Sequence, residues 1–124
     1  MTGKEYQELA MRTNDGKAYN RLSVNVMSAK FYETPTLLNG VLGLTGEAGE
    51  VSDLVKKGIF HEKGIDETHL KKELGDVMWY IAMICHACGF DLDEILQMNV
   101  DKLKARYPEG FDTERANNRN KDDI

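Results

Sequence analysis

The sequence predicts an all-α protein, a bundle of four to five helices, and three observations support this fold class. Apolar residues recur at intervals of three and four along two long segments, residues 35–57 and 67–87, which is the period of an amphipathic helix. Only two prolines occur in 124 residues, so long helices can continue without interruption. No segment shows the pair of alternating runs that is typical of a β-hairpin.

The N-terminal third gives a mixed pattern. Residues 5–12 resemble a short amphipathic helix, which ends before Asp15-Gly16. Residues 17–33 are ambiguous, because their apolar positions fit an irregular or extended segment as well as a helix. Thr34 is predicted to be the N-cap of the first long helix, with Pro35 in the first turn.

The remaining boundaries are marked by turn residues. A loop is expected over residues 58–66, and the second long helix is expected to stop before Gly89. Asp91 is predicted to cap a last helix that ends near Tyr107. Residues 115–124 are almost entirely polar and are expected to form a disordered tail, which leaves one domain over residues 1–114.

Composition excludes several classes of protein. The chain carries 16 Lys and Arg against 21 Asp and Glu, a net charge of -5, which disfavours a protein that binds duplex nucleic acid. No apolar run approaches the ~18–20 residues of a transmembrane helix, and the first residues lack the apolar segment of a signal peptide. Cys85 and Cys88 lie within an apolar helical pattern rather than a disulfide framework, so we expect a cytoplasmic protein.

The most informative pattern is a pair of carboxylates on each long helix. Glu47 and Glu50 lie one turn apart beside the apolar face of the first helix, and Glu73 and Asp76 occupy the matching edge of the second. Antiparallel packing would bring all four together. Carboxylate oxygens are the ligands that Mg²⁺ prefers, so the pattern predicts a magnesium site.

A solvated helix face is the alternative explanation, since acid pairs at this spacing are common and lysines lie nearby. The glycines Gly40 and Gly43 on the same edge favour the metal site, because they would leave an open slot beside it. Spacing alone leaves both explanations open.

The residues around these acids also resemble a known family. The runs Gly43-Leu44-Thr45-Gly46-Glu47-Ala48-Gly49-Glu50-Val51 and Lys72-Glu73-Leu74-Gly75-Asp76-Val77, with 22 residues between Glu50 and Glu73, resemble the MazG-type nucleotide pyrophosphohydrolases. Trp79-Tyr80 and the later segment from Asn99 to Phe111 match as well. The resemblance covers roughly residues 37–111, and we take residues 35–111 as the core of a MazG-like domain.

The resemblance implies an all-α homodimer or dimer of dimers that hydrolyses nucleoside triphosphates to the monophosphate and pyrophosphate. By position, Glu47, Glu50, Glu73 and Asp76 would bind Mg²⁺, with Mn²⁺ as a substitute. Cleavage of the α–β linkage needs a directed water, and Glu47 or Glu50 would orient or deprotonate it. The sequence does not choose between the two.

Substrate contacts are predicted on two further elements. Asn99, Lys102 and Arg106 share one stripe of the last helix, where a solvated edge is the alternative, and the resemblance places Asn99 and Lys102 at the substrate. Lys57 is a candidate at the end of the first acidic helix, although a cation there also complements the helix dipole. Tyr80 is expected either to stack on the base or to pack in the core.

Base specificity stays open, because residues 15–33 depart from the plain form of the family. House-cleaning of non-canonical nucleotides is the leading role. The alternatives are the same fold acting on dUTP or phosphoribosyl-ATP, and a non-catalytic helical dimer that binds nucleotides or a protein.

Overall fold

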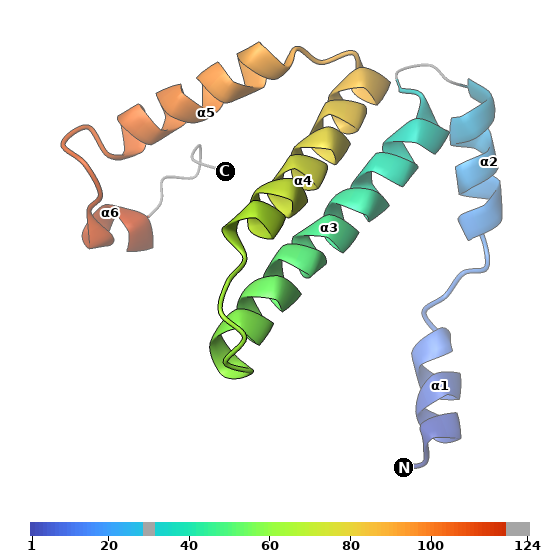
Figure 1. The fold of residues 1–124 in the computed structure, drawn as a ribbon. Helices are drawn as coiled ribbons and strands as arrows, with labels where there is room; N and C mark the ends of the chain where they lie inside the picture. The colour runs from blue at the N-terminus through green and yellow to red at the C-terminus, as the bar shows by residue number, and fades with distance from the viewer. Residues whose placement is uncertain (29–31, 119–124) are drawn as a thin grey trace. The chain divides into compact units, whose positions relative to one another are not determined.

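The computed structural model describes residues 1–28 and 32–118. The described residues form helices only, without a strand, which confirms the predicted all-α class (Figure 1). In chain order these helices are α1 (Gly3–Met11), α2 (Ala18–Ser28), α3 (Thr34–Phe60), α4 (Glu67–Cys88), α5 (Leu92–Arg106) and α6 (Thr113–Asn117).

The chain divides into two compact units, residues 1–88 and residues 89–124. The first unit contains α1 to α4, and the second contains α5 and α6. The structure describes each unit by itself. The three acids that it brings together, and the cavity beside them, lie in the first unit.

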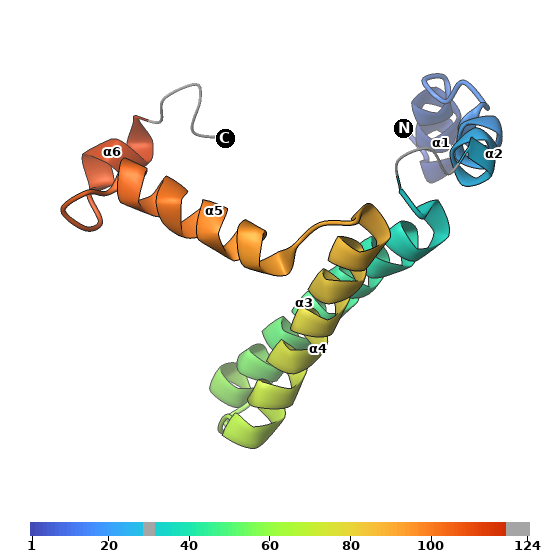
Figure 2. The same cartoon turned by 90° about the horizontal axis from the view of Figure 1, so that it is seen from above.

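Helices α3 and α4 form an antiparallel hairpin that runs side by side in both Figure 1 and Figure 2. Contacts between them pair early residues of α3 with late residues of α4. Gly40 packs against Ile84, and Gly43 packs against Tyr80. At the open end of the hairpin, the Glu33 amide donates a 3.0 Å hydrogen bond to the carbonyl oxygen of Ala87. Antiparallel packing is the arrangement that brings the four acids onto facing edges.

The start of α3 differs from the prediction. Thr34 is the first helical residue rather than the N-cap, and Glu33 takes the N-cap position without a side-chain hydrogen bond to the helix. The Thr34 hydroxyl instead donates to the carbonyl oxygen of Asn25 at 3.3 Å, which ties the start of α3 to α2. The ambiguous segment that precedes it is helical over α2, while residues 29–31 lie outside the described part.

The junction between α4 and α5 agrees with its turn residues, whereas α3 runs to Phe60, past the expected start of the loop at Gly58. Gly89 follows α4 with a φ of 67°, a left-handed conformation that glycine adopts without strain. The Asp91 side chain accepts a hydrogen bond from the Asp93 amide and caps α5, as predicted. Of the polar segment predicted to be a tail, residues 115–117 belong to α6, and residues 119–124 lie outside the described part.

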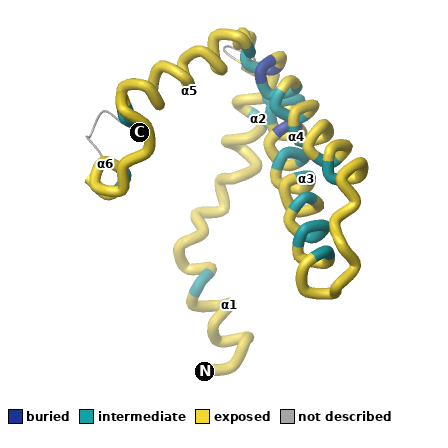
Figure 3. The backbone as a smooth tube through the Cα atoms, turned by 60° about the vertical axis from the view of Figure 1, so that its left-hand side comes forward, coloured by how far each residue is buried: buried dark blue, intermediate teal, exposed yellow. Residues whose placement is uncertain are grey.

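Few side chains of the described residues are buried. Gly40, Cys85 and Ala87 are buried, and all three lie where the open ends of α3 and α4 pack together. Figure 3 shows half-buried residues along both helices of this hairpin. Large apolar side chains stay exposed, among them Leu42 at 64% and Trp79 at 57%. Tyr6 and Leu9 of α1 are exposed as well, although an amphipathic helix was predicted there.

Among the described helices, none combines the length and the apolar character that crossing a membrane requires.

Candidate metal centre

Three of the four predicted metal ligands meet between α3 and α4. Carboxylate oxygens of Glu47, Glu73 and Asp76 lie within 4.8 Å of one another. Glu73 and Asp76 stand one turn apart on α4, and Glu47 approaches them from the facing edge of α3. We call these three residues the carboxylate cluster. Glu50 lies one turn further along α3 and is not part of it.

The charges of the cluster are close enough to affect one another. The pKa of Glu47 is raised above its ordinary value, first because partial burial disfavours the charged form and then because of the negative charges of Asp76, Glu73 and Glu50. Like charges at this separation repel, and a bound cation removes that repulsion. The cluster is therefore an arrangement that a cation would stabilise.

The donor set fits a hard divalent cation such as Mg²⁺. All three donors are hard carboxylate oxygens, and no sulfur or imidazole ligand takes part in the cluster. Octahedral Mg²⁺ places its ligand oxygens at ~2.0–2.1 Å, so opposite ligands stand ~4 Å apart. The carboxylate oxygens of the cluster, within 4.8 Å of one another, are separated on the same scale. Asp76 is exposed, which leaves room for water and phosphate oxygens on the outer side.

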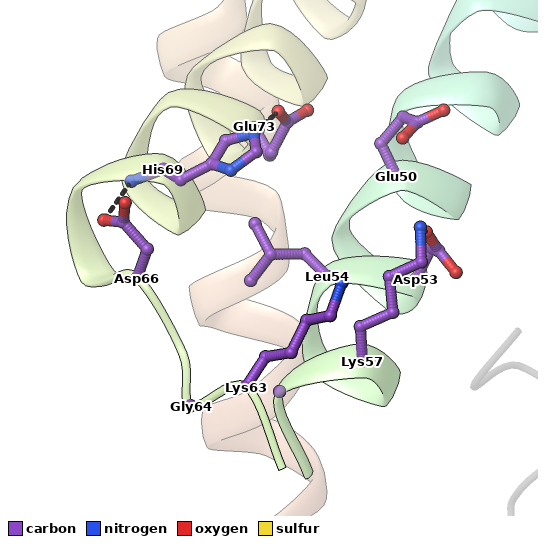
Figure 4. Close-up of a pocket in the computed structure, with 10 residues that line it drawn as sticks. Glu50, Asp53, Leu54, Lys57, Lys63, Gly64, Asp66, His69 and Glu73 are labelled. Atoms are coloured by element: carbon purple, nitrogen blue, oxygen red, sulfur yellow. Dashed lines mark hydrogen bonds and ion pairs between the residues drawn. The ribbon is translucent and has the colours of Figure 1, made fainter. Parts of the chain in front are cut away.

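A cavity of about 340 Å³ adjoins the cluster, on the side toward the loop that joins α3 to α4 (Figure 4). Glu50 and Glu73 line the end of the cavity that is nearest to the carboxylate cluster. The remaining lining residues come from the end of α3, from the loop and from the start of α4: Asp53, Leu54, Lys57, Gly58, Lys63, Gly64, Asp66 and His69.

His69 lines the cavity of the candidate site and was not predicted from the sequence. Its Nε2 atom lies 2.7 Å from an oxygen of Glu73, one turn along α4 (Figure 4). The His69 amide donates to the Asp66 side chain at 3.0 Å, so Asp66 caps the first turn of α4, which begins at Glu67. The interval of four residues to Glu73 was the available signal, since such residues are neighbours on a helix.

Lys57 lines the cavity and is held by an acid. Its Nζ atom lies 2.5 Å from Asp53, which also pairs with Lys56 at 2.9 Å. Hydrogen bonds from Lys57 and Lys56 lower the pKa of Asp53 to about 2, and the bond to Asp53 raises the pKa of Lys57. Lys57 is therefore positively charged beside the cavity, whereas Lys56 does not line it.

Tyr80 lies on the other side of the cluster, one turn after Asp76. Its ring packs directly on Gly43, where even a Cβ atom would collide with it. Trp79 stands edge-on to the same ring, with the ring centres 4.9 Å apart. The open slot expected at Gly40 and Gly43 is therefore wrong, because Ile84 and Tyr80 fill those positions.

The substrate contacts predicted on α5 belong to the second unit. Asn99 and Lys102 are exposed, and Arg106 is half-buried at the end of the helix. The Arg106 guanidinium lies 5.9 Å from the centre of the Tyr107 ring, and its carbonyl oxygen accepts a hydrogen bond from Arg115. Their predicted role at the carboxylate cluster stays a prediction.

Comparison with known proteins agrees with the family resemblance seen in the sequence. The MazG nucleotide pyrophosphohydrolase domain matches residues 36–111, a range that contains the whole carboxylate cluster. Gene 37 protein of Mycobacterium phage L5 is 37% identical over 82 residues, which cover 63% of this chain and 72% of the phage protein. No solved structure shows a significant match. With its matched range and its acids on facing helices, the chain belongs to the MazG nucleotide pyrophosphohydrolase family.

Proposed function

We propose that this protein is a Mg²⁺-dependent nucleoside triphosphate pyrophosphohydrolase, with Mn²⁺ as a substitute metal. It cleaves the α–β linkage of ribo- or deoxyribonucleoside triphosphates to give the monophosphate and pyrophosphate, in a house-cleaning role against non-canonical nucleotides. The observation that carries the proposal is the meeting of Glu47, Glu73 and Asp76 between two helices of a MazG domain. Glu50 completes the proposed ligand set from the border of the cavity.

Hydrolysis at the α-phosphorus requires one bond to form and one to break. The oxygen of a water molecule bonds to the α-phosphorus, the bond from that phosphorus to the α–β bridging oxygen breaks, and pyrophosphate leaves with the electron pair. A divalent cation would offset the negative charge of the triphosphate and favour a nucleophilic water. The chain's own carboxylates hold the site in place and accept the proton of the water.

Glu47 is the better proton acceptor of the two candidates. It belongs to the carboxylate cluster and is half-buried there. Glu50 is exposed and borders the cavity instead. We assign water orientation to Glu47 and metal binding at the cavity side to Glu50.

The nucleotide itself needs contacts outside the acids. Tyr80 lies one turn beyond Asp76 and is half-buried, and it is proposed to stack on the base. Lys57 is proposed at the phosphates, and Asn99, Lys102 and Arg106 of the second unit are proposed as substrate contacts.

We propose that the active protein is a cytoplasmic homodimer or homotetramer. Exposed apolar side chains on α3 and α4, such as Leu42, Met78 and Trp79, support an interface between copies. Sedimentation at micromolar concentration tests this assembly, and a monomer there would contradict it.

A panel of nucleotides tests the activity. Canonical and modified nucleoside triphosphates, dUTP and phosphoribosyl-ATP are incubated with Mg²⁺, and pyrophosphate and orthophosphate are measured separately. We expect pyrophosphate with the matching monophosphate, and no reaction in EDTA. Orthophosphate alone would contradict the proposal, and nucleotide binding without turnover would indicate the non-catalytic binding protein instead.

A further inference from the structure

Side chains of four kinds follow one another along α4. His69 lines the cavity, Glu73 belongs to both the cavity and the carboxylate cluster, Asp76 belongs to the cluster alone, and Tyr80 follows one turn later. At 1.5 Å per residue this series spans about 16 Å. The cavity and the aromatic surface therefore lie at opposite ends of the cluster.

The cavity has the size of a site for a small ligand. About 340 Å³ is at the lower end of the ~300–1,000 Å³ that ligand pockets occupy, which suits a small anion better than a whole nucleotide. One side is closed because the loop folds onto α3. The Gly64 amide donates to the Gly58 carbonyl oxygen at 3.2 Å, and a Cβ atom on Gly58 would lie 2.6 Å from Ile65.

The donors of the cavity suit phosphate oxygens. Lys57 and Lys63 approach from the end of α3 and from the loop, opposite His69 and Glu73 on α4 (Figure 4). A lysine ammonium donates to phosphate, whereas the Nε2 atom of His69 is already paired with Glu73. Two of the acids in the lining are already engaged, Asp53 by two lysines and Asp66 by the His69 amide.

The lining as a whole still carries four carboxylates against two lysines. A free phosphate anion would be repelled, whereas an anion that shares a divalent cation with Glu50 and Glu73 would be attracted. The charge pattern thus selects a metal-chelated phosphate.

From this arrangement we propose that the cavity at the α3–α4 loop binds the pyrophosphate end of the substrate, as its magnesium complex, with Lys57 and Lys63 as donors. The nucleoside then lies toward Tyr80, and the α-phosphorus lies at the carboxylate cluster. This inference rests on the proposed function and adds the orientation of the bound nucleotide along the α3–α4 hairpin.

The orientation of the substrate determines the side from which the water attacks. In an in-line displacement the water enters opposite the leaving group. Glu50 borders the cavity that receives pyrophosphate, whereas Glu47 does not line it. The geometry therefore agrees with Glu47 as the carboxylate that orients the water.

Calorimetric titration with magnesium pyrophosphate tests the proposal on the full chain. Lys63→Gln and Lys57→Gln should each bind the complex about tenfold more weakly than wild type, because each loses one charge-assisted contact. Lys56→Gln is the matched control, since Lys56 pairs with the same Asp53 but does not line the cavity. We expect its affinity to stay within about twofold of wild type. Monophosphate affinity should stay unchanged in all three variants.

Other results would overturn the inference. Pyrophosphate affinity that is unaffected by Lys63→Gln and Lys57→Gln would place the leaving group elsewhere, and a loss confined to the monophosphate would reverse the orientation. If wild type releases pyrophosphate from nucleotides but does not bind it in the titration, the inference fails and the proposed function stands. If wild type binds magnesium pyrophosphate but hydrolyses no nucleotide, the proposed function fails and the anion site stands.

Discussion

The two ends of the α3–α4 hairpin use the same pair of helices in different ways. At the open end, Gly40 and Gly43 let the side chains of Ile84 and Tyr80 pack directly on the backbone of α3. Toward the loop, the facing positions are Glu47, Glu73 and Asp76. One end is closely packed and apolar, and the other places like charges side by side.

This difference shows how a small domain can hold repelling charges in place. Close packing on glycine fixes the distance and register of the helices, and that register carries the acids into proximity one turn later. The open end supplies stability that the acidic end lacks without a cation. The predictions that follow test this division, from the largest effect to the smallest.

Removal of a cluster carboxylate should have the largest effect. Asp76→Asn loses a charged oxygen donor and should lower the rate of pyrophosphate release by at least roughly a hundredfold. Glu8→Gln on α1 makes a similar charge change away from the cluster and should retain the wild-type rate. Steady-state kinetics with a saturating nucleoside triphosphate measures both. A wild-type rate in Asp76→Asn would remove Asp76 from the site.

Adding a methyl group at the packed end should reduce stability. The Cβ atom of Gly43→Ala collides with the Tyr80 ring, and such overpacking costs about 1–3 kcal/mol of unfolding free energy. Gly46→Ala is a matched control in the same helix, because nothing lies within 4 Å of its Cβ position. Alanine there should leave stability unchanged or raise it by ~0.5–1 kcal/mol. Chemical denaturation compares the two, and equal stabilities would show that Tyr80 does not pack on Gly43.

Because the acids of the cluster repel one another, Asp76→Asn should raise the melting temperature without metal and lower it relative to wild type when Mg²⁺ is present. In EDTA, Asp76→Asn relieves the repulsion on Glu47 and should raise the melting temperature slightly. With Mg²⁺, wild type should gain stability from bound metal and the variant should gain much less. Thermal melts under both conditions decide this. A lower melting temperature for the variant in EDTA would mean that the acids do not repel one another.

The smallest effect on stability is expected from the protonation of Asp53 at acidic pH. Its pKa falls from 3.8 to about 2 in the folded protein, so its ion pairs stabilise the fold above pH 3.8 and lose this contribution as the pH falls toward 2. Asp53→Asn should therefore lose less stability than wild type over that interval. Denaturant titrations across the interval test this, and parallel pH profiles would indicate that the ion pairs contribute nothing.

Much of the fold was predictable because it depends on local signals. Helical periodicity located α3 and α4, and Gly89 and Asp91 marked the junction to α5. Thr34 was misassigned because its hydroxyl bonds to Asn25 of another helix, a tertiary contact that capping rules do not include. The packing of Tyr80 on Gly43 was missed for the same reason, since periodicity does not show which side chain fills a space.

The candidate site was predictable where it follows helix geometry. Two acid pairs at helical spacing, on helices expected to pack antiparallel, predicted that all four acids would come together. Glu47, Glu73 and Asp76 do meet, whereas Glu50 is not part of the cluster. The cavity was not predictable, because it depends on a loop that folds back onto Gly58 and brings Lys63 beside it. Such a loop leaves no periodic trace in the sequence.

Metal binding tests the central claim most directly. Mn²⁺ titration followed by electron paramagnetic resonance measures the affinity of wild type and of Glu47→Gln without any nucleotide present. If the carboxylate cluster holds the cation, Glu47→Gln should bind Mn²⁺ at least about tenfold more weakly than wild type, with Glu8→Gln unchanged. Equal Mn²⁺ affinity in all three proteins would contradict the account.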